Sequence, residues 1–167
     1  MNNVLDQTMA ISNIELIFVG SLTKYVDLTD WEKAYPNSIM LINIEDELSD
    51  EELINIALEY VSGEYVNIYN TYYDYLDGLR HLYLASHNKK CDIGACGITY
   101  GDGSDYYITI NSPEEASAII KANILHSSTN NKIYAKSIIQ KNNLDYSRLF
   151  SNDALLFTKT VYCSKEK

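Results

Sequence analysis

The stretch SIMLINIEDELSDEELINIALEYV, residues 38–61, contains the two clearest structural signals in the chain. Its first part, 38–44, is a short run of aliphatic and β-branched residues, which is typical of a buried strand. The second part opens with Ser49, and Glu52 stands three residues later, which is the pattern of a helix capping box. A helical stripe of apolar residues follows, formed by Leu53, Ile54, Ala57, Leu58 and Val61. We predict a strand and then a helix over about 50–62.

The residues on both sides of this stretch extend the pattern. Asn13 to Val19 is a second short apolar run followed by Gly20, so we predict another strand there. Between the two strands, Thr29 indicates the start of a short helix that stops near Pro36, because proline cannot continue a helix. Residues 64–88 are rich in tyrosine and are predicted to form a short strand followed by a helix.

The second half of the chain is predicted to contain a hairpin, a helix and a final strand. A glycine-rich turn at 101–104 lies between the β-prone runs 95–100 and 105–110, so we predict a β-hairpin. A helix over 132–141 and a final strand over 154–162 complete this part.

One further helix start is well marked. Ser112, Pro113 and Glu115 combine an N-cap serine, a proline at the first helical position and a glutamate three residues after the cap. With this helix, the order of elements favours an α+β fold over a regular βαβ repeat. We predict a single compact domain over 1–167, with a mixed or antiparallel sheet and about four helices.

The composition indicates a folded intracellular protein. Of the 167 residues, 46% are hydrophobic and 22% are charged, which is typical of a globular domain. The apolar runs are too short to cross a bilayer. The N-terminus also lacks the positively charged residues and the long apolar stretch of a secretory signal peptide. Three cysteines, an odd number, favour reduced thiols over disulfides. We therefore predict a cytoplasmic location.

The net charge argues against nucleic-acid binding. Thirteen basic and twenty-three acidic residues give a net charge of −10, which phosphate groups repel. The charge is also uneven, because residues 1–120 hold five basic and twenty acidic residues, whereas residues 121–167 hold eight basic and three acidic ones. We predict a basic protein partner and neither a nucleic acid nor a membrane.

Four residues with zinc or thiol chemistry fall within sixteen positions: His81, His87, Cys91 and Cys96. Their spacing lacks the Cys-x-x-Cys pair of common zinc modules, and the alternative is that the cysteines are small buried residues beside a strand. No Rossmann, P-loop or Gly-x-Ser-x-Gly motif occurs. We predict no catalytic residue, no metal and no other cofactor.

The densest charge run places six carboxylates within eight positions, from Glu45 to Glu52. The last three acids are explained by the favourable interaction of carboxylates with a helix N-terminus. Glu45, Asp46 and Glu47 precede that helix, and we predict that they form a recognition surface for a basic protein.

Tyrosine is unusually frequent, with fifteen tyrosines against three phenylalanines and one tryptophan. Tyrosine-rich surfaces often contain binding hot spots. The second candidate binding surface therefore consists of Tyr72, Tyr73, Asp74, Tyr75 and Asp77. The alternative is AT-rich codon usage combined with ordinary packing, because Ile, Asn and Tyr share AT-rich codons.

The segment Tyr72-Tyr73-Asp74-Tyr75-Leu76-Asp77-Gly78-Leu79 resembles the start of the toxin-binding helix of barstar, the barnase inhibitor. The shared features are paired tyrosines, then Leu-Asp, then a small residue and Leu. The small size, the acidity and the lack of a catalytic motif also resemble bacterial immunity proteins of contact-dependent and other polymorphic toxin systems. This resemblance implies a binding protein that is not an enzyme and whose partner is a nuclease toxin domain.

We therefore hypothesise a cytoplasmic immunity protein that blocks the basic active site of a cognate nuclease, with the acids and tyrosines above replacing substrate phosphates. A phage-type inhibitor of host defence that mimics nucleic acid fits the same features. A small zinc or thiol enzyme that uses His81, His87, Cys91 and Cys96 is the alternative from a different class.

Overall fold

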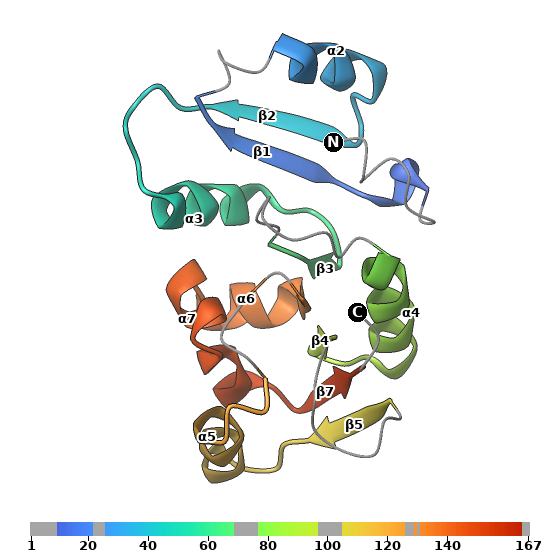
Figure 1. The fold of residues 1–167 in the computed structure, drawn as a ribbon, viewed down its shortest axis with the longest axis vertical. Helices are drawn as coiled ribbons and strands as arrows, with labels where there is room; N and C mark the ends of the chain where they lie inside the picture. The colour runs from blue at the N-terminus through green and yellow to red at the C-terminus, as the bar shows by residue number, and fades with distance from the viewer. Residues whose placement is uncertain are drawn as a thin grey trace. The chain divides into compact units, whose positions relative to one another are not determined.

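The computed structural model describes residues 10–21, 26–68, 77–96, 105–125, 129 and 131–164, with the backbone alone at 26, 27, 77 and 78 (Figure 1). The chain divides into two compact units, Met1–Gly63 (unit 1) and Glu64–Lys167 (unit 2). Each unit has its own sheet.

Unit 1 is built on a β-α-β arrangement. Strand β1 (Leu16–Gly20) is followed by helix α2 (Val26–Ala34) and strand β2 (Ile39–Asn43), and the two strands are parallel. Parallel strands need a crossover connection of this kind. Helix α2 packs against β2, and helix α3 (Asp50–Tyr60) packs against β1. A 3-10 helix, η1 (Ile11–Asn13), precedes the first strand.

A capping box sets the start of α3. The Ser49 hydroxyl accepts a hydrogen bond from the Glu52 backbone N–H at 3.3 Å, and the Glu52 carboxylate accepts from the Ser49 backbone N–H at 2.8 Å. The Ser49 hydroxyl also donates to this carboxylate, and these bonds hold the pKa of Glu52 below its usual value. Beyond the helix, the Ser62 N–H and hydroxyl donate to the Glu15 carboxylate at 2.8 and 2.9 Å. The helix predicted over about 50–62 is confirmed.

Unit 2 contains a five-stranded mixed sheet in the order β3-β6-β4-β7-β5. Strands β4 and β7 are parallel, and the other neighbouring pairs are antiparallel. The strands are β3 (Tyr65–Val66), β4 (Ile93–Ala95), β5 (Tyr106–Thr109), β6 (Lys132–Ala135) and β7 (Thr160–Cys163).

Helix α4 (Asp77–Lys89) covers one face of this sheet. Side chains alternate between the two faces along a strand, and Ile133 and Tyr162 point to the face on which Leu82 of α4 is buried. Gly94 lies between them on β4, and a side chain at this position would meet Ser86 of α4. The helix therefore depends on a glycine for its close approach to the sheet.

Four short helices complete unit 2: α5 (Pro113–Lys121), α6 (Lys136–Asn142), α7 (Tyr146–Phe150) and the 3-10 helix η3 (Asp153–Phe157). Helix α6 packs against β6, and η3 contacts the other three helices. The buried Tyr134 of β6 points away from α4 and donates its hydroxyl to the Leu149 carbonyl at 3.2 Å. At the start of α5, the Ser112 hydroxyl accepts from the Glu115 N–H at 3.3 Å, as its cap pattern predicts.

The α+β class with a mixed sheet is confirmed, and the described residues form six α-helices where about four are predicted. Residues 64–88 include a short strand and a helix, also as predicted. The chain divides into two compact units, and this division does not decide whether they form one domain or two. The single-domain organisation therefore stays a prediction. None of the described helices is long and apolar enough to span a membrane.

The predicted hairpin stays a prediction, because residues 97–104, which hold its turn and most of its first strand, lie outside the described residues. The described strands β4 and β5 are not neighbours, because β7 lies between them in the sheet. The start of the helix predicted over 132–141 is wrong: the helix begins only at Lys136, because residues 132–135 form the interior strand β6. The final strand is shorter than predicted, since the first residues of 154–162 belong to η3.

Candidate functional site

The carboxyl ends of β1 and β2 lie side by side in unit 1. Gly20 pairs with Asn43, and the Ile44 N–H donates to the Gly20 carbonyl at 3.0 Å. Gly20 has a φ of +132°, a conformation that strongly favours glycine. In open α/β sheets, ligands bind just outside the carboxyl ends of parallel strands. We call Gly20, Asn43 and the acids that follow β2 the unit 1 edge.

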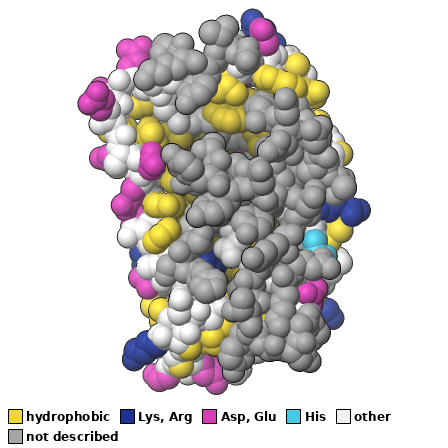
Figure 2. All heavy atoms as spheres, in the orientation of Figure 1, with side chains coloured by type: hydrophobic (Ala, Val, Ile, Leu, Met, Phe, Trp, Pro, Cys, Tyr) yellow, Lys and Arg dark blue, Asp and Glu magenta, His cyan; other side chains and the backbone are white. Residues whose placement is uncertain are grey.

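Three predicted site residues belong to this edge. Glu45, Asp46 and Glu47 follow β2 directly, and all three are exposed. Figure 2 shows acidic side chains gathered over the connection between β2 and α3 and over α3 itself. The structure therefore places a set of carboxylate acceptors where the two parallel strands end.

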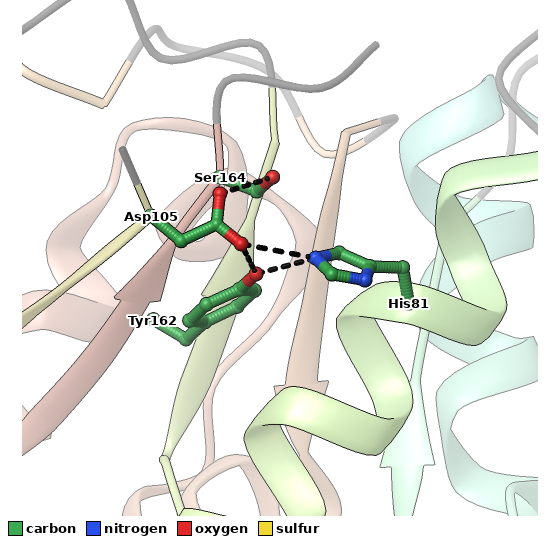
Figure 3. Close-up of polar contacts among 4 residues, drawn as sticks. All are labelled: His81, Asp105, Tyr162 and Ser164. Carbon is green, nitrogen blue, oxygen red and sulfur yellow. Dashed lines mark hydrogen bonds and ion pairs between the residues drawn. The ribbon is translucent and has the colours of Figure 1, made fainter. Parts of the chain in front are cut away.

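A second polar group lies in unit 2, where α4, β5 and β7 meet. We call it the Asp105 cluster, and its members are His81, Asp105, Tyr162 and Ser164 (Figure 3). The Tyr162 hydroxyl donates to Asp105 Oδ2 at 2.5 Å, and the Ser164 hydroxyl donates to Asp105 Oδ1 at 3.0 Å. The His81 Nε2 lies 2.5 Å from the Tyr162 oxygen and 3.2 Å from Asp105 Oδ2. Because the phenol gives its one proton to Asp105, its oxygen accepts from a protonated His81 Nε2.

The protonation states of this cluster follow from its hydrogen bonds. Burial raises the pKa of Asp105, but the hydrogen bonds from Tyr162, Ser164 and His81 together outweigh it and hold this pKa below its usual value. Burial and the bond to Asp105 raise the pKa of Tyr162 well above that of a free phenol. A general base works best with a pKa near the working pH, and neither group has one. The cluster is therefore a hydrogen-bond network that links three elements.

We expect Tyr162→Phe to lower the free energy of unfolding by about 1.5 kcal/mol, because Asp105 loses a charge-assisted hydrogen bond while the ring remains packed. Asp105 has a lower pKa in the folded chain than in the unfolded chain. Its stabilising contribution is therefore present above the unfolded pKa and is lost as the pH falls through the folded pKa. Urea unfolding at neutral and at acidic pH should show that the loss of unfolding free energy caused by Tyr162→Phe is smaller in acid. Tyr107→Phe, which removes the hydroxyl of a half-exposed tyrosine on the same face, should have little effect.

Lys132 is a fully buried lysine at the start of β6, with 0% of its surface exposed. It pairs with Ala95 at the carboxyl end of β4, on the face of the sheet opposite Ile133. Burial lowers the pKa of Lys132 to about 8. The electrostatic interaction with Cys96 raises this pKa, but by less than burial lowers it. The sequence pattern does not single out this residue, because a lysine in a predicted helix is expected at the surface.

The structure does not bring the four predicted zinc or thiol residues into one site. His81 belongs to the Asp105 cluster, whereas His87 Nδ1 contacts the Glu64 carboxylate at 2.9 Å. Cys91 and Cys96 are buried in the core, and burial raises the pKa of both thiols, which disfavours a reactive thiolate. Among the residues that the structure describes, no group of three or more His, Cys, Asp or Glu side chains could hold a metal ion.

The tyrosine-rich candidate surface is not tested. Tyr72, Tyr73, Asp74 and Tyr75 lie outside the described residues, and Asp77 begins α4 with only its backbone described.

The chain is similar in fold to several solved structures. No protein-family model and no curated protein matches the chain. The crystal structure of Staphylococcus aureus TarS 1–349 matches with a TM-score of 0.72 and 17% identity, over 99% of this chain and 53% of that chain. The chain therefore shares its fold with the matched part of TarS 1–349. TarS 1–349 in complex with UDP matches with a TM-score of 0.71 and 17% identity, over the same shares of both chains.

A third structure, of S. aureus TarS, matches with a TM-score of 0.68 and 17% identity, over 99% of this chain and 32% of that chain. The chain therefore spans about half the length of TarS 1–349. At this level of identity, the similarity to TarS is one of fold.

The match to TarS corrects the predicted function. The chain shares its fold with TarS over 99% of its length. This finding contradicts the hypotheses of an immunity protein or phage-type inhibitor, of a nuclease toxin as partner and of a chain that is not an enzyme. The barstar-like segment does not indicate the fold either. The acids from Glu45 to Glu47 look the same in sequence whether they face a basic protein or the hydroxyl groups of a small ligand.

Proposed function

We propose that the chain is the nucleotide-binding part of a sugar-nucleotide transferase and that it binds UDP at the unit 1 edge. The observation that carries this proposal is the position of Glu45, Asp46 and Glu47 directly beyond the carboxyl ends of two parallel strands. The similarity in fold to TarS, which was crystallised in complex with UDP, supports the choice of nucleotide.

The nucleoside part of UDP suits this edge chemically. Uracil offers one N–H donor and ribose offers hydroxyl donors, while an ionised carboxylate only accepts hydrogen bonds. Dinucleotide-binding folds use an acidic residue about 20 positions after the first glycine-bearing turn to hold a ribose hydroxyl. Here Glu45 follows Gly20 by 25 positions and comes directly after the second strand.

The diphosphate part has the opposite requirement. The six carboxylates from Glu45 to Glu52 repel phosphate groups, so UDP should bind more tightly in the presence of Mg²⁺, which neutralises phosphate charge. We assign no metal ligands, because among the described residues no three potential ligands converge.

Calorimetric titration of the full chain with UDP, with and without Mg²⁺, tests the proposal. We expect UDP to bind and the double variant Glu45→Gln/Asp46→Asn to bind it about 10- to 100-fold more weakly. A hydrogen bond to a charged group contributes about 1.5 to 3 kcal/mol, which corresponds to that range.

The matched control is Glu59→Gln, which removes a carboxylate from the last turn of α3, away from the unit 1 edge. It should leave UDP binding unchanged. The proposal is wrong if UDP does not bind, or if the control weakens binding as much as the double variant does.

We also propose that the protein acts in the cytoplasm. Cys91, Cys96 and Cys163 are all free and buried, and free cysteines are typical of a reducing compartment.

A further inference from the structure

A pocket of about 420 Å³ opens on unit 2 between the C-terminal end of α4, the starts of β3 and β4, and the start of α6. Small-molecule sites commonly have volumes of about 300 to 1,000 Å³. The residues that matter for its chemistry are Tyr65, His87, Lys90, Lys136, Ser137 and Gln140. Nothing in the UDP proposal uses this pocket.

Two carboxylates also line the pocket, and both are already engaged. Glu64 contacts His87 Nδ1 through both of its oxygens, at 2.9 and 3.1 Å. Asp92 Oδ2 accepts from the backbone N–H groups of Lys159 and Thr160, at 2.7 and 3.3 Å. Both carboxylates therefore have hydrogen-bond partners already, and the positive charges of Lys90 and Lys136 balance their two negative charges in the pocket wall.

Aromatic side chains give the pocket a rigid wall. The Tyr65 hydroxyl donates to the Cys91 carbonyl at 2.8 Å, and its ring meets Tyr83 edge-on with ring centroids 5.9 Å apart. Tyr83 in turn stacks on His87, with centroids 5.4 Å apart. Burial, helped by the Glu64 charge, raises the pKa of Tyr65 to about 12, so this wall stays uncharged at neutral pH.

Lys90 has an unfavourable backbone conformation. Its φ is +54°, and it ends α4 at a position where the Lys90 and Cys91 N–H groups donate to the carbonyls of His87 and Ser86. Helices that end in this way usually have glycine at the left-handed position, because a side chain is strained there. The fold alone thus favours glycine at position 90. Lysine at this position instead brings a positively charged residue to the lining of the pocket.

We propose that this pocket binds a small organic oxyanion, a carboxylate or phosphate attached to a flat apolar body, with Lys90 holding the anionic group. The hydroxyl of Ser137 and the amide of Gln140 add hydrogen-bond donors on the side of α6. The Tyr65 ring contacts the apolar body. A cation is a poorer fit, because the two carboxylates of the pocket already have partners.

NMR titration of the ¹⁵N-labelled full chain with phenyl phosphate, benzoate and the neutral benzamide tests this proposal. The two anions should shift the amide signals of 87–92 and 135–140, and benzamide should shift them much less. Signals from both anions indicate a general oxyanion site, whereas signals from one of them identify its preferred group. The proposal is overturned if neither anion shifts these signals, or if benzamide binds equally well.

Variants at Lys90 separate binding from structure. Lys90→Gly should weaken anion binding at least about tenfold and leave the melting temperature unchanged or raised, because glycine relieves the backbone strain. Lys90→Gln should weaken binding to a similar degree. Lys89→Gln is the matched control, because it removes the neighbouring charge from a residue that does not line the pocket, and binding should persist. Equal losses for Lys89→Gln and Lys90→Gln would mean that general surface charge, and no built site, attracts the anion.

Discussion

Gly94→Ala is expected to destabilise unit 2 by about 3 kcal/mol, because the added methyl group has no space. A Cβ at this position would lie 2.3 Å from the Ser86 Oγ and 3.1 Å from the Ile133 Cγ1. Ser86 has 0% of its surface exposed and Ile133 has 1%, so neither side chain can move into solvent. Urea unfolding followed by circular dichroism measures the loss.

Ser86→Ala provides the control. The Ser86 hydroxyl is buried without a hydrogen-bond partner among the described residues, so removing it should be neutral or mildly stabilising. The same change removes the atom that the new methyl group would meet. The double variant should therefore recover part of the loss, with a coupling of about 1 to 2 kcal/mol between the two positions. A strictly additive double variant would show that α4 does not approach β4 as closely as the structure has it.

Helix starts were predictable because their signals are local. Ser49 and Glu52 satisfy each other within one turn of helix, and the Ser112 hydroxyl accepts from the Glu115 N–H at the start of α5. The start of α6 shows the contrast. Its N-cap residue, Ala135, makes no side-chain capping bond, so no residue marks the point where strand β6 becomes helix. The sequence from Lys132 onwards then looks like one continuous helix.

Strand pairing was not predictable, because it joins residues that are far apart in the sequence. The glycines at 101–104 favour a turn, and a turn between two β-prone runs predicts a hairpin. In the sheet, β7, which comes at the end of the chain, lies between β4 and β5 and pairs with both. A local turn signal cannot report a strand that enters from elsewhere.

The candidate sites divide in the same way. Glu45, Asp46 and Glu47 were identified from their density, which a sequence displays directly, although their assignment to a basic protein was wrong. The Asp105 cluster was missed, because His81 and Tyr162 are 81 positions apart and meet only through the order of the sheet. Lys90 was also missed, since its left-handed conformation has no signature in the sequence.

The other large effect is expected at Lys132. Its pKa is about 8 in the folded chain, against an ordinary value of 10.5. Below pH 8 the lysine is charged in both states, and the folded state bears the cost of the buried charge. Between about pH 8 and 10.5, the folded state releases the proton while the unfolded state keeps it, so stability rises with pH. The difference of about 2.5 between the ordinary and the folded pKa of Lys132 corresponds to a cost of about 3 kcal/mol for burying the charged form.

Lys132→Met removes this charge and keeps much of the side-chain volume. The variant should therefore be more stable than the wild type at pH 7, by up to about 3 kcal/mol, and the gap should narrow steadily from pH 8 to pH 10.5. Tyrosines also titrate in this pH range, but they affect the stability of the wild type and of Lys132→Met alike. Their effect therefore cancels in the difference between the two proteins. Lys141→Met, at an exposed position in the last turn of α6, controls for the loss of one positive charge and should not gain stability as Lys132→Met does at pH 7. Parallel stability curves for the wild type and Lys132→Met over this range would mean that the folded protein does not lower the pKa of Lys132, because only a pKa that differs between the two states can make the gap depend on pH.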